Sequence, residues 1–583
     1  MLLRSFESFE KTENGYLIHG DAADVKLIFM TDDIIRVRVH FDKGTPMEEE
    51  SYTLVTTAWP DRMDDLLKDE RTRITALDVP CTEDEKCLTF ETAHVTLKLF
   101  KKPFHFEMYD KEGKLLYQDL RERAFEKDQI GRLTHFSKVD REYDHFFGFG
   151  EKTGHLDKKG RRLRMSPKDA IGHDPETGDP MYKHIPFYIR VNEKDRRPIG
   201  LFYHNSYDYT LLTGRSALPT KQSLGYCAST MYYAELEKNC DEEIYKVIDK
   251  HEKEGILIDN FWLASGYSSG EEDNLRYVFN WNHKRFPDPK KFFENMNARG
   301  INVIPNLKPG ILKRHPYIDL FEKNDVFIKT PDGKAPYYGR WWGGEGRFFD
   351  FTGPKGRDTW KQLLEENILK MGTKTVWNDN CEMDGVEDRD AQCDFEGKKG
   401  TMAELKILHS NLMAYTAKHA LAEVYPGERP YIINRAGYAG IQRYAQVWGG
   451  DNLTDWRTVK FNIATILGMG LSGCSNMGCD IGGFAGPAPE AELLLRWLQN
   501  GVLQPRFCLN SANNDNTVTQ PWMYEENLPY IREAYKLRYR LMPTLYSLMY
   551  ESNQDGMPAW RPLFLEFPDD PKCYTDKNLT FMF

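Results

Sequence analysis

Two aspartates, Asp379 and Asp451, stand where short apolar stretches end, and together they could carry out acid and nucleophile chemistry. Asp379 follows Thr375-Val376-Trp377, and Asp451 follows Val447-Trp448-Gly449-Gly450. Two carboxylates across a cleft suit the cleavage of a glycosidic bond, because one attacks or stabilises while the other protonates the leaving oxygen. The alternative is that each aspartate only forms a turn after a core strand.

Alternating strands and helices must position these groups. Ile244, Val247, Ile248 and His251 have the spacing of an amphipathic helix, and similar segments separate short apolar strands. An α/β fold with a (β/α)8 barrel over residues 216–550 is therefore predicted. An open doubly wound sheet usually has a Gly-rich loop after its first strand, and none is found here. The eight predicted strands lie near 223–229, 258–264, 301–306, 374–379, 431–435, 446–450, 475–479 and 505–509.

Several of these strands end in polar groups, which should converge on the C-terminal face of the barrel. A long connection at 310–370 carries Trp342 and is expected near the mouth of the barrel. The polar groups predicted at the strand ends are Asp379, Glu382, Asn434, Arg435, Asp451, Asp480, Arg506 and Asn510.

The regions on either side of the barrel have a different pattern. Ile35–Phe41 and Val95–Leu99 alternate apolar and polar residues, so residues 1–215 are predicted to form an N-terminal antiparallel β-sandwich. A helix is predicted at 528–550. Residues 551–583 are interpreted as the truncated start of a C-terminal β-domain, with a strand at Arg561–Phe567.

Composition narrows the class of partner. The chain has 583 residues, a net charge of −11 and 13% aromatic residues. Because no basic run occurs, nucleic acid and an anionic membrane are not expected as partners, whereas a carbohydrate suits the many aromatic faces. The N-terminus does not have the apolar core of a signal peptide, and no apolar run approaches a membrane span. The oligomeric state is left open.

The cysteines and acidic clusters predict no metal or cofactor. The ten cysteines form no CxxC pair, which favours free thiols in a reducing cytoplasm. The acidic run from Glu382 resembles a calcium loop, but Ala391 stands where the bidentate glutamate is required.

The motifs quoted next resemble those of the retaining α-glycosidases of glycoside hydrolase family 31. Trp377–Glu382 resembles the nucleophile motif of that family, Trp448–Asn452 its acid/base motif, and Phe147–Glu151 its sandwich motif. Further matches occur in order along the chain, at Phe286–Pro289, Phe349–Thr352, Asp480–Gly483 and Arg496–Gly501.

The resemblance implies roles for individual residues. Asp379 is expected to be the nucleophile and Asp451 the general acid/base, with retention of configuration and carboxyl groups about 5–5.5 Å apart. Arg435 and Arg443 are the cations expected to keep Asp379 ionised. Glu382 and Glu151 are expected to be supporting residues. The residues expected to bind substrate are Trp262, Ala264, Gly266, Trp342, Trp377, Asn378, Arg435, Arg443, Trp448, Asp480 and Asn510.

Departures from the family pattern bear on the sugar. Family α-glucosidases carry aspartates after strand two, where this chain has Ala264 and Gly266, and a histidine after strand eight, where it has Asn510. A buried site that lacks these hydrogen-bonding groups should discriminate strongly against glucose, the substrate they would bind. The pattern therefore resembles the branch that acts on α-linked N-acetylgalactosamine, with room for an acetamido group beside Ala264 or Gly266.

Two alternatives remain open. The chain could be an α-glucosidase or α-galactosidase on the same scaffold, or an inactive sugar-binding fragment. The second alternative rests on a sandwich that is shortened between Leu201–Asn205 and Leu212–Arg215 and on C-terminal β-domains of the family that are missing here.

Overall fold

The computed structural model describes residues 1–47, 49–204, 216–512, 518–574 and 581–582. The chain divides into two compact units. Unit 1 comprises Met1–His145 with Arg190–Gly200, and unit 2 comprises Phe146–Ile189 with Leu201–Phe583. The predicted sandwich boundary at 215 and the segment where the sandwich is predicted to be shortened lie outside the described residues.

Unit 2 contains a closed parallel barrel, with each of the eight predicted strands in its place. Every neighbouring pair of strands is parallel. Strand seven is interrupted at Cys479, and its two halves pair with opposite neighbours, which closes the ring. The strands are β17 (Tyr226–Thr230), β18 (Asn260–Leu263), β19 (Asn302–Leu307), β23 (Thr375–Asn378), β26 (Tyr431–Asn434), β27 (Gln446–Trp448), β28 (Met477–Gly478) with β29 (Asp480–Ile481), and β30 (Phe507–Leu509).

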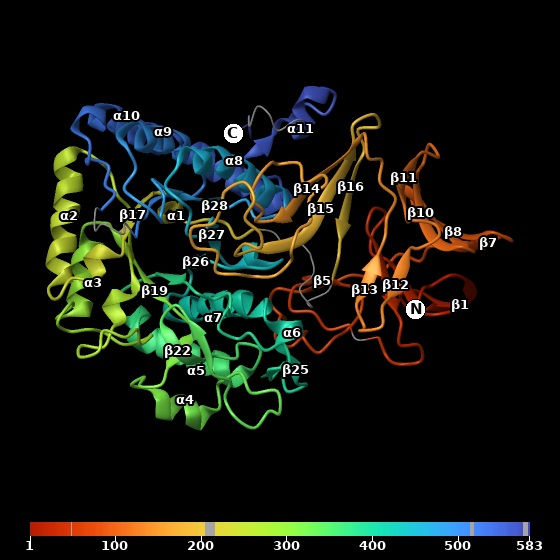
Figure 1. Cartoon of the computed structure of the whole chain (residues 1–583), viewed down its shortest axis with the longest axis horizontal. Coiled ribbons are helices and arrows are strands. Elements are labelled where there is room, and N and C mark those ends of the chain that lie inside the picture. The colour runs from red at the N-terminus through yellow and green to blue at the C-terminus, as the bar shows by residue number, and fades with distance from the viewer. Residues whose placement is uncertain (48, 205–215, 513–517, 575–580, 583) are drawn as a thin grey trace. The chain divides into compact units, whose positions relative to one another are not determined.

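Helices surround these strands, as Figure 1 shows for unit 2. The predicted amphipathic helix is α2, Cys240–Glu254, and the four residues that predicted it are all buried. The short helix α6 (Met402–Leu405) ends before the longer helix α7 (Leu408–Val424) begins. The remaining long helices are α3 (Pro289–Ala298), α5 (Pro354–Asn367), α8 (Trp456–Leu471), α9 (Ala491–Gly501) and α10 (Leu528–Asp555).

The long connection after β19 is structured. It contains a three-stranded antiparallel sheet of β20 (Gly310–Leu312), β22 (Gly344–Phe348) and β21 (Gly339–Trp341), and the short helix α4 (Ile318–Asn324). Trp342 lies in the tight turn between β21 and β22. The hairpin therefore holds this tryptophan on a rigid element.

Unit 1 is the predicted antiparallel sandwich. Its first sheet has the order β1 (Phe6–Thr12), β2 (Gly15–Gly20), β3 (Asp24–Phe29) and β4 (Ile35–His40). Its second sheet contains β7 (Cys81–Glu83), β8 (Cys87–Glu91), β9 (Val95–Lys101), β10 (Phe104–Asp110) and β11 (Leu115–Gln118). Apolar residues of both sheets form one buried cluster, as the alternation predicts for two facing sheets.

The predicted strand at Arg561–Phe567 is largely wrong. Only Arg561–Pro562 is extended, as β31, and Leu563–Glu566 forms the short helix α11. The pattern of an apolar run this short does not by itself distinguish a strand from a helix. Within the described part of the chain, no helix combines the length and apolar character that a membrane span requires.

Candidate active site

Asp379 lies at the C-terminal end of β23, with its side chain held by three neighbours. Its backbone N–H donates to the carbonyl oxygen of Leu307 at 2.9 Å, which keeps it in the barrel ladder. Asn306 Nδ2 lies 3.0 Å from Oδ2, the Lys308 ammonium contacts the same oxygen, and Arg435 Nε lies 3.1 Å from Oδ1. The next residue, Asn380, has a φ of 49°, a value that asparagine tolerates, so the chain turns directly after the carboxylate.

These neighbours decide the charge of Asp379. Burial alone would raise the pKa of this carboxyl. The charges of Arg435 and Lys308 and the amide of Asn306 outweigh burial and hold the pKa well below its ordinary value. Asp379 is therefore an ionised carboxylate at neutral pH, as a nucleophile must be.

Asp451 follows β27 and has the opposite electrostatic setting. Burial and the carboxylates of Asp379, Asp169 and Asp480 raise the pKa of Asp451 to about 8, against the opposing charge of Arg435. A carboxyl group that keeps its proton at neutral pH can serve as a general acid.

A close packing contact fixes the backbone beside this acid. Gly450 has a φ of 65°, and a Cβ there would stand 1.9 Å from the ring of Tyr182. Glycine at this position therefore allows the fully buried Tyr182 to approach, and the hydroxyl of Tyr182 accepts the backbone N–H of Asp451 at 3.3 Å.

Arg435 joins the carboxylates of the site. Its guanidinium forms two hydrogen bonds of 2.8 Å with Glu382 and lies 2.9 Å from Asp169 and 3.3 Å from Asp451. Burial raises the pKa of Glu382 to about 7, although the charge of Arg435 opposes this shift. Both carboxylate oxygens of Glu382 are thus bonded to Arg435, which argues against a catalytic role for Glu382 itself.

A second buried network follows strands seven and eight. Asp480 Oδ1 accepts from Arg506 Nη2 at 2.8 Å, and Asp480 Oδ2 accepts from Asn510 Nδ2 at 3.0 Å. All three side chains are buried. Arg506 stacks 4.3 Å from the ring centre of Trp262, which lies in the barrel core. Arg506 therefore orients Asp480 from below.

The predicted tryptophans divide into two groups. Trp262, Trp377 and Trp448 pack against one another inside the barrel. Trp262 and Trp448 are fully buried in the barrel core, so neither presents an exposed face to a sugar in this structure. Trp342 is 49% exposed, and the Lys308 ammonium, which contacts Asp379, lies 4.8 Å from the centre of its ring.

The end of β18 is shaped differently from what was predicted for Gly266. A Cβ on Gly266 would stand 2.2 Å from the carbonyl oxygen of Ala234, so the neighbouring backbone fills that side. Ala264 is buried and has only a methyl group. A small cavity lies close by, and the residues that line it are Ser265, Ser268, Arg276, Val278, Asn306, Lys308, Gly310 and Trp341. The available space therefore lies towards Lys308 and Asn306.

Two further predicted ligands point elsewhere. Asn378 is buried and donates to Asn434 Oδ1 at 2.8 Å, because alternate residues of a strand face opposite sides and Asp379 takes the inner one. Arg443 Nε donates to the carbonyl oxygen of Gly440 at 3.2 Å, and its guanidinium lies 4.7 Å from the ring centre of Tyr444. The second cation beside Asp379 is Lys308.

The sequence interpretation missed Asn306, Lys308, Asp169, Tyr182 and Lys183. Asn306 and Lys308 directly follow the apolar residues of strand three, so the strand-end rule applied to the other strands also indicates these two. Asp169, Tyr182 and Lys183 come from the segment before the barrel, in a stretch without periodicity. No sequence signal places them at the strand ends.

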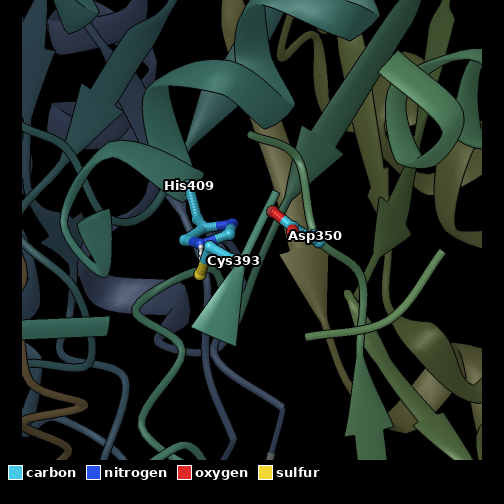
Figure 2. A group of neighbouring side chains, drawn as sticks. All are labelled: Asp350, Cys393 and His409. Atoms are coloured by element: carbon cyan, nitrogen blue, oxygen red, sulfur yellow. Dashed lines mark hydrogen bonds between the residues drawn. The ribbon is translucent and has the colours of Figure 1, made fainter. Parts of the chain in front are cut away.

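One cluster elsewhere in the barrel resembles a metal site, and Figure 2 shows it. Atoms of Asp350, Cys393 and His409 lie within 4.8 Å of one another, and all three residues are buried. The donor atoms already have partners. Asp350 accepts from the backbone N–H groups of Thr352 and Asp394, at 2.9 and 2.6 Å. His409 Nδ1 accepts from the Phe351 backbone, and Nε2 lies 3.6 Å from the Cys393 sulfur.

These hydrogen bonds explain the cluster without an ion. Burial lowers the pKa of His409 to about 3, so the imidazole is neutral, with one nitrogen accepting and the other donating. The hydrogen bonds tie the loop at Asp350 to the start of α7. The cluster is therefore held together by its own hydrogen bonds.

Comparison with protein families covers most of the chain. The model described as "Glycosyl hydrolases family 31 TIM-barrel domain" matches residues 216–548. The model described as "Glycosyl hydrolase 31 N-terminal galactose mutarotase-like domain" matches residues 24–211.

Individual relatives agree with these models. "Alpha-glucosidase 2" of Bacillus thermoamyloliquefaciens is 31% identical over 616 residues, covering 98% of this chain and 74% of the relative. Human "Neutral alpha-glucosidase C" is 33% identical over 386 residues, covering 63% of this chain and 40% of the relative. The match thus spans less than half of the human protein.

Solved structures share the fold. A Flavobacterium johnsoniae GH31 dextranase complexed with glucose has a TM-score of 0.84 at 21% identity, covering 100% of this chain and 74% of the other. A GH31 alpha-xylosidase from a soil metagenome has a TM-score of 0.80 at 18% identity, covering 99% of this chain and 90% of the other.

Proposed function

The chain belongs to glycoside hydrolase family 31, and on that premise we propose that it removes a terminal α-linked sugar by double displacement. Asp379 attacks the anomeric carbon while Asp451 protonates the leaving oxygen, and Asp451 then deprotonates the water that releases the sugar. The observation that carries the proposal is the pair of opposite pKa shifts in two carboxyl groups that contact one guanidinium.

The surrounding residues serve these two steps. Lys308, Asn306 and Arg435 keep Asp379 charged before attack. When Asp379 becomes an ester its charge disappears, which removes one of the carboxylates that raise the pKa of Asp451. Asp451 can then act as a base in the second step, as the mechanism requires. No step of this scheme uses a metal or an organic cofactor.

The names of the relatives support glucose as the sugar. The curated relatives reported above are named α-glucosidases, and the matched dextranase was solved with glucose. The half-exposed ring of Trp342 suits a hexose, because aromatic rings stack on sugar rings.

N-acetylgalactosamine is the second candidate, and a specific feature of the site supports it. Ala264 and Asn510 replace the aspartate and histidine expected in family α-glucosidases. The hydroxyl, amide and ammonium groups that line the small cavity beside Asn306 and Lys308 are of the kind that donate to the carbonyl oxygen of an acetamido group. The space lies beside these residues and not beside Gly266.

A panel of nitrophenyl α-glycosides tests both candidates. The wild-type protein and the A264D variant are compared on α-glucoside, α-galactoside and α-N-acetylgalactosaminide. A glucosidase prefers the glucoside in both forms. For the second candidate, A264D should lose activity on the N-acetyl substrate by tenfold or more, on the order of the cost of a misplaced polar group. No turnover of any of these substrates would favour the inactive sugar-binding alternative.

We also propose that the protein works in a reducing, cytoplasmic environment. All ten cysteines are unpaired. Asn452, which begins a glycosylation-like Asn-Leu-Thr sequence, is 1% exposed and donates to the carbonyl oxygen of Asp480 at 3.2 Å. Buried Asn452 cannot accept a glycan, which supports the proposal. Cell fractionation with an antibody tests it.

A further inference from the structure

An ion pair is buried directly beneath the proposed acid/base residue. Lys183 Nζ lies 2.5 Å from Glu151 Oε2, and both residues are 0% exposed. Glu151 follows β14 (Asp144–Gly150), and Lys183 precedes β15 (His184–Asn192). Removing two charges from water costs free energy, and the cost is offset only if both groups also form well-aligned hydrogen bonds. The other hydrogen bonds of Lys183 therefore indicate its role.

Those contacts reach two barrel strands at once. Lys183 Nζ donates to the carbonyl oxygen of Arg435 at 2.9 Å and to that of Trp448 at 2.7 Å. Arg435 follows β26, and Trp448 is the last residue of β27. The ladder between these strands pairs Ile433 with Gln446 and Asn434 with Val447, and it ends there. The ammonium group thus links the two strands just beyond the last backbone pair of the ladder.

The two carbonyl groups belong to the parts of the chain that carry the chemistry. Arg435 contacts Asp379 and Asp451 through its side chain, and Asp451 lies three residues after Trp448. We infer that Lys183 is a positioning residue, which sets the spacing between Arg435 and Asp451 by joining the ends of β26 and β27. Glu151 balances its charge, so the ammonium can be buried there. This inference rests on the proposed function.

A double-mutant cycle separates positioning from stability. K183M removes the donor and leaves Glu151 unpaired, E151Q keeps the donor, and K183M/E151Q removes both charges. Melting temperature should fall in K183M and recover in part in the double variant, because no unpaired charge remains. Turnover should not recover, because the two carbonyl groups still have no donor.

The leaving group provides the readout of position. Aryl glycosides with poor leaving groups need protonation by Asp451, whereas dinitrophenyl glycosides need little. K183M/E151Q should lose about 10- to 100-fold in kcat/KM on the poor leaving groups, the scale of a small misplacement. This constant reports the first step, so the loss in kcat/KM on dinitrophenyl substrates should be much smaller. E151Q keeps the donor, so its loss in kcat/KM on the poor leaving groups should be well below that of K183M.

Arg538 offers a matched control. It is fully buried and donates to the carbonyl oxygens of Leu224, Val502, Gln504 and Pro505, at the N-terminal ends of β17 and β30. R538M should lower the melting temperature without changing the dependence on the leaving group.

Two results would overturn the inference: a wild-type leaving-group dependence in K183M/E151Q, or an equal loss in E151Q and K183M. If K183M does not fold, the comparison rests on K183M/E151Q, E151Q and the wild-type protein, because the double variant leaves no unpaired charge. The melting temperatures can be measured without a substrate, so they test the stability part of the inference even if the proposed function is wrong. Absence of turnover by the wild-type protein would count against the proposed function and not against the inference about Lys183.

Discussion

Asp379 and Asp451 share one guanidinium group: Arg435 Nε lies 3.1 Å from Asp379 and Arg435 Nη1 lies 3.3 Å from Asp451. The two carboxyls nevertheless differ in charge, because Lys308 and Asn306 form hydrogen bonds with the carboxylate of Asp379 and not with that of Asp451. Carboxylates that lie close together cannot all ionise easily, so stabilising one anion raises the pKa of its neighbour. The predicted separation of about 5–5.5 Å stays a prediction.

Replacing Asp379 should abolish turnover and reveal its role through an added nucleophile. D379A is expected to lose about 10⁴-fold or more in kcat, as removal of a nucleophile does elsewhere. Azide can then occupy the vacated side of the sugar, so an α-linked substrate should yield the β-glycosyl azide. In D451A, azide should attack the glycosyl-enzyme and yield the α-glycosyl azide. Nuclear magnetic resonance distinguishes the two products.

The exposed Asp390 serves as the control for this pair. It lies in the loop after the site, and D390A should keep wild-type turnover with and without azide. Formation of the same anomer by D379A and D451A would contradict the double-displacement scheme. Normal turnover by D379A would remove Asp379 from its role.

Asp451 should make the folded state less stable as the pH rises. Folding raises the pKa of Asp451 to about 8, so the folded state binds this proton more tightly than the unfolded chain, whose carboxyl has a pKa of about 4. Stability is therefore lost as the pH rises through this interval. D451N removes the proton exchange and should melt several degrees above the wild-type protein at pH 8 and above.

Melting curves between pH 4 and pH 9 measure the effect. The difference between D451N and the wild-type protein should be small near pH 4, where both side chains are neutral, and should grow up to about pH 8. D390N again provides the exposed control. A constant difference across this range would show that Asp451 does not hold a raised pKa.

Lys308 should protect the activity of the site in acid. K308M removes a charge that lowers the pKa of Asp379, so this pKa should move up towards its ordinary value. The acid limb of kcat/KM should shift to higher pH, and the loss at pH 4 should exceed the loss at pH 7 severalfold. Lys313, an exposed lysine nearby in the chain, supplies the control K313M. Parallel pH profiles for the wild-type protein and K308M would refute the role.

The barrel was predictable because its pattern is local. Short apolar strands such as β23, buried on both faces, alternate with amphipathic helices such as α2, and each signal is contained in a short stretch of sequence. Asp379 and Asp451 followed from the same rule, since parallel strands present their C-terminal ends on one face.

The rest of the site depends on contacts between distant segments. Nothing near Lys183 indicates that its ammonium reaches Arg435 and Trp448, because more than 250 residues separate them in the chain. Likewise the sequence could not distinguish the buried Trp262 from the exposed Trp342. The backbone of Ala234 packs against Gly266 and leaves no room for a ligand group beside this glycine. This contact joins distant segments, so the sequence alone does not indicate it.

Removing metal ions should leave both stability and turnover unchanged. The cluster most like a metal site within the described ranges has its oxygen and nitrogen atoms engaged in hydrogen bonds, as Asp350 bonds to Thr352 and His409 to Phe351. A chelator such as EDTA, followed by dialysis, should therefore change neither the melting temperature nor kcat. C393A should lower the free energy of unfolding by about 1–2 kcal/mol, the cost of a small buried cavity, and should therefore lower the melting temperature with or without added zinc. A melting temperature that rises with zinc in the wild-type protein but not in C393A would instead identify a real metal site, because only binding to the folded state stabilises it.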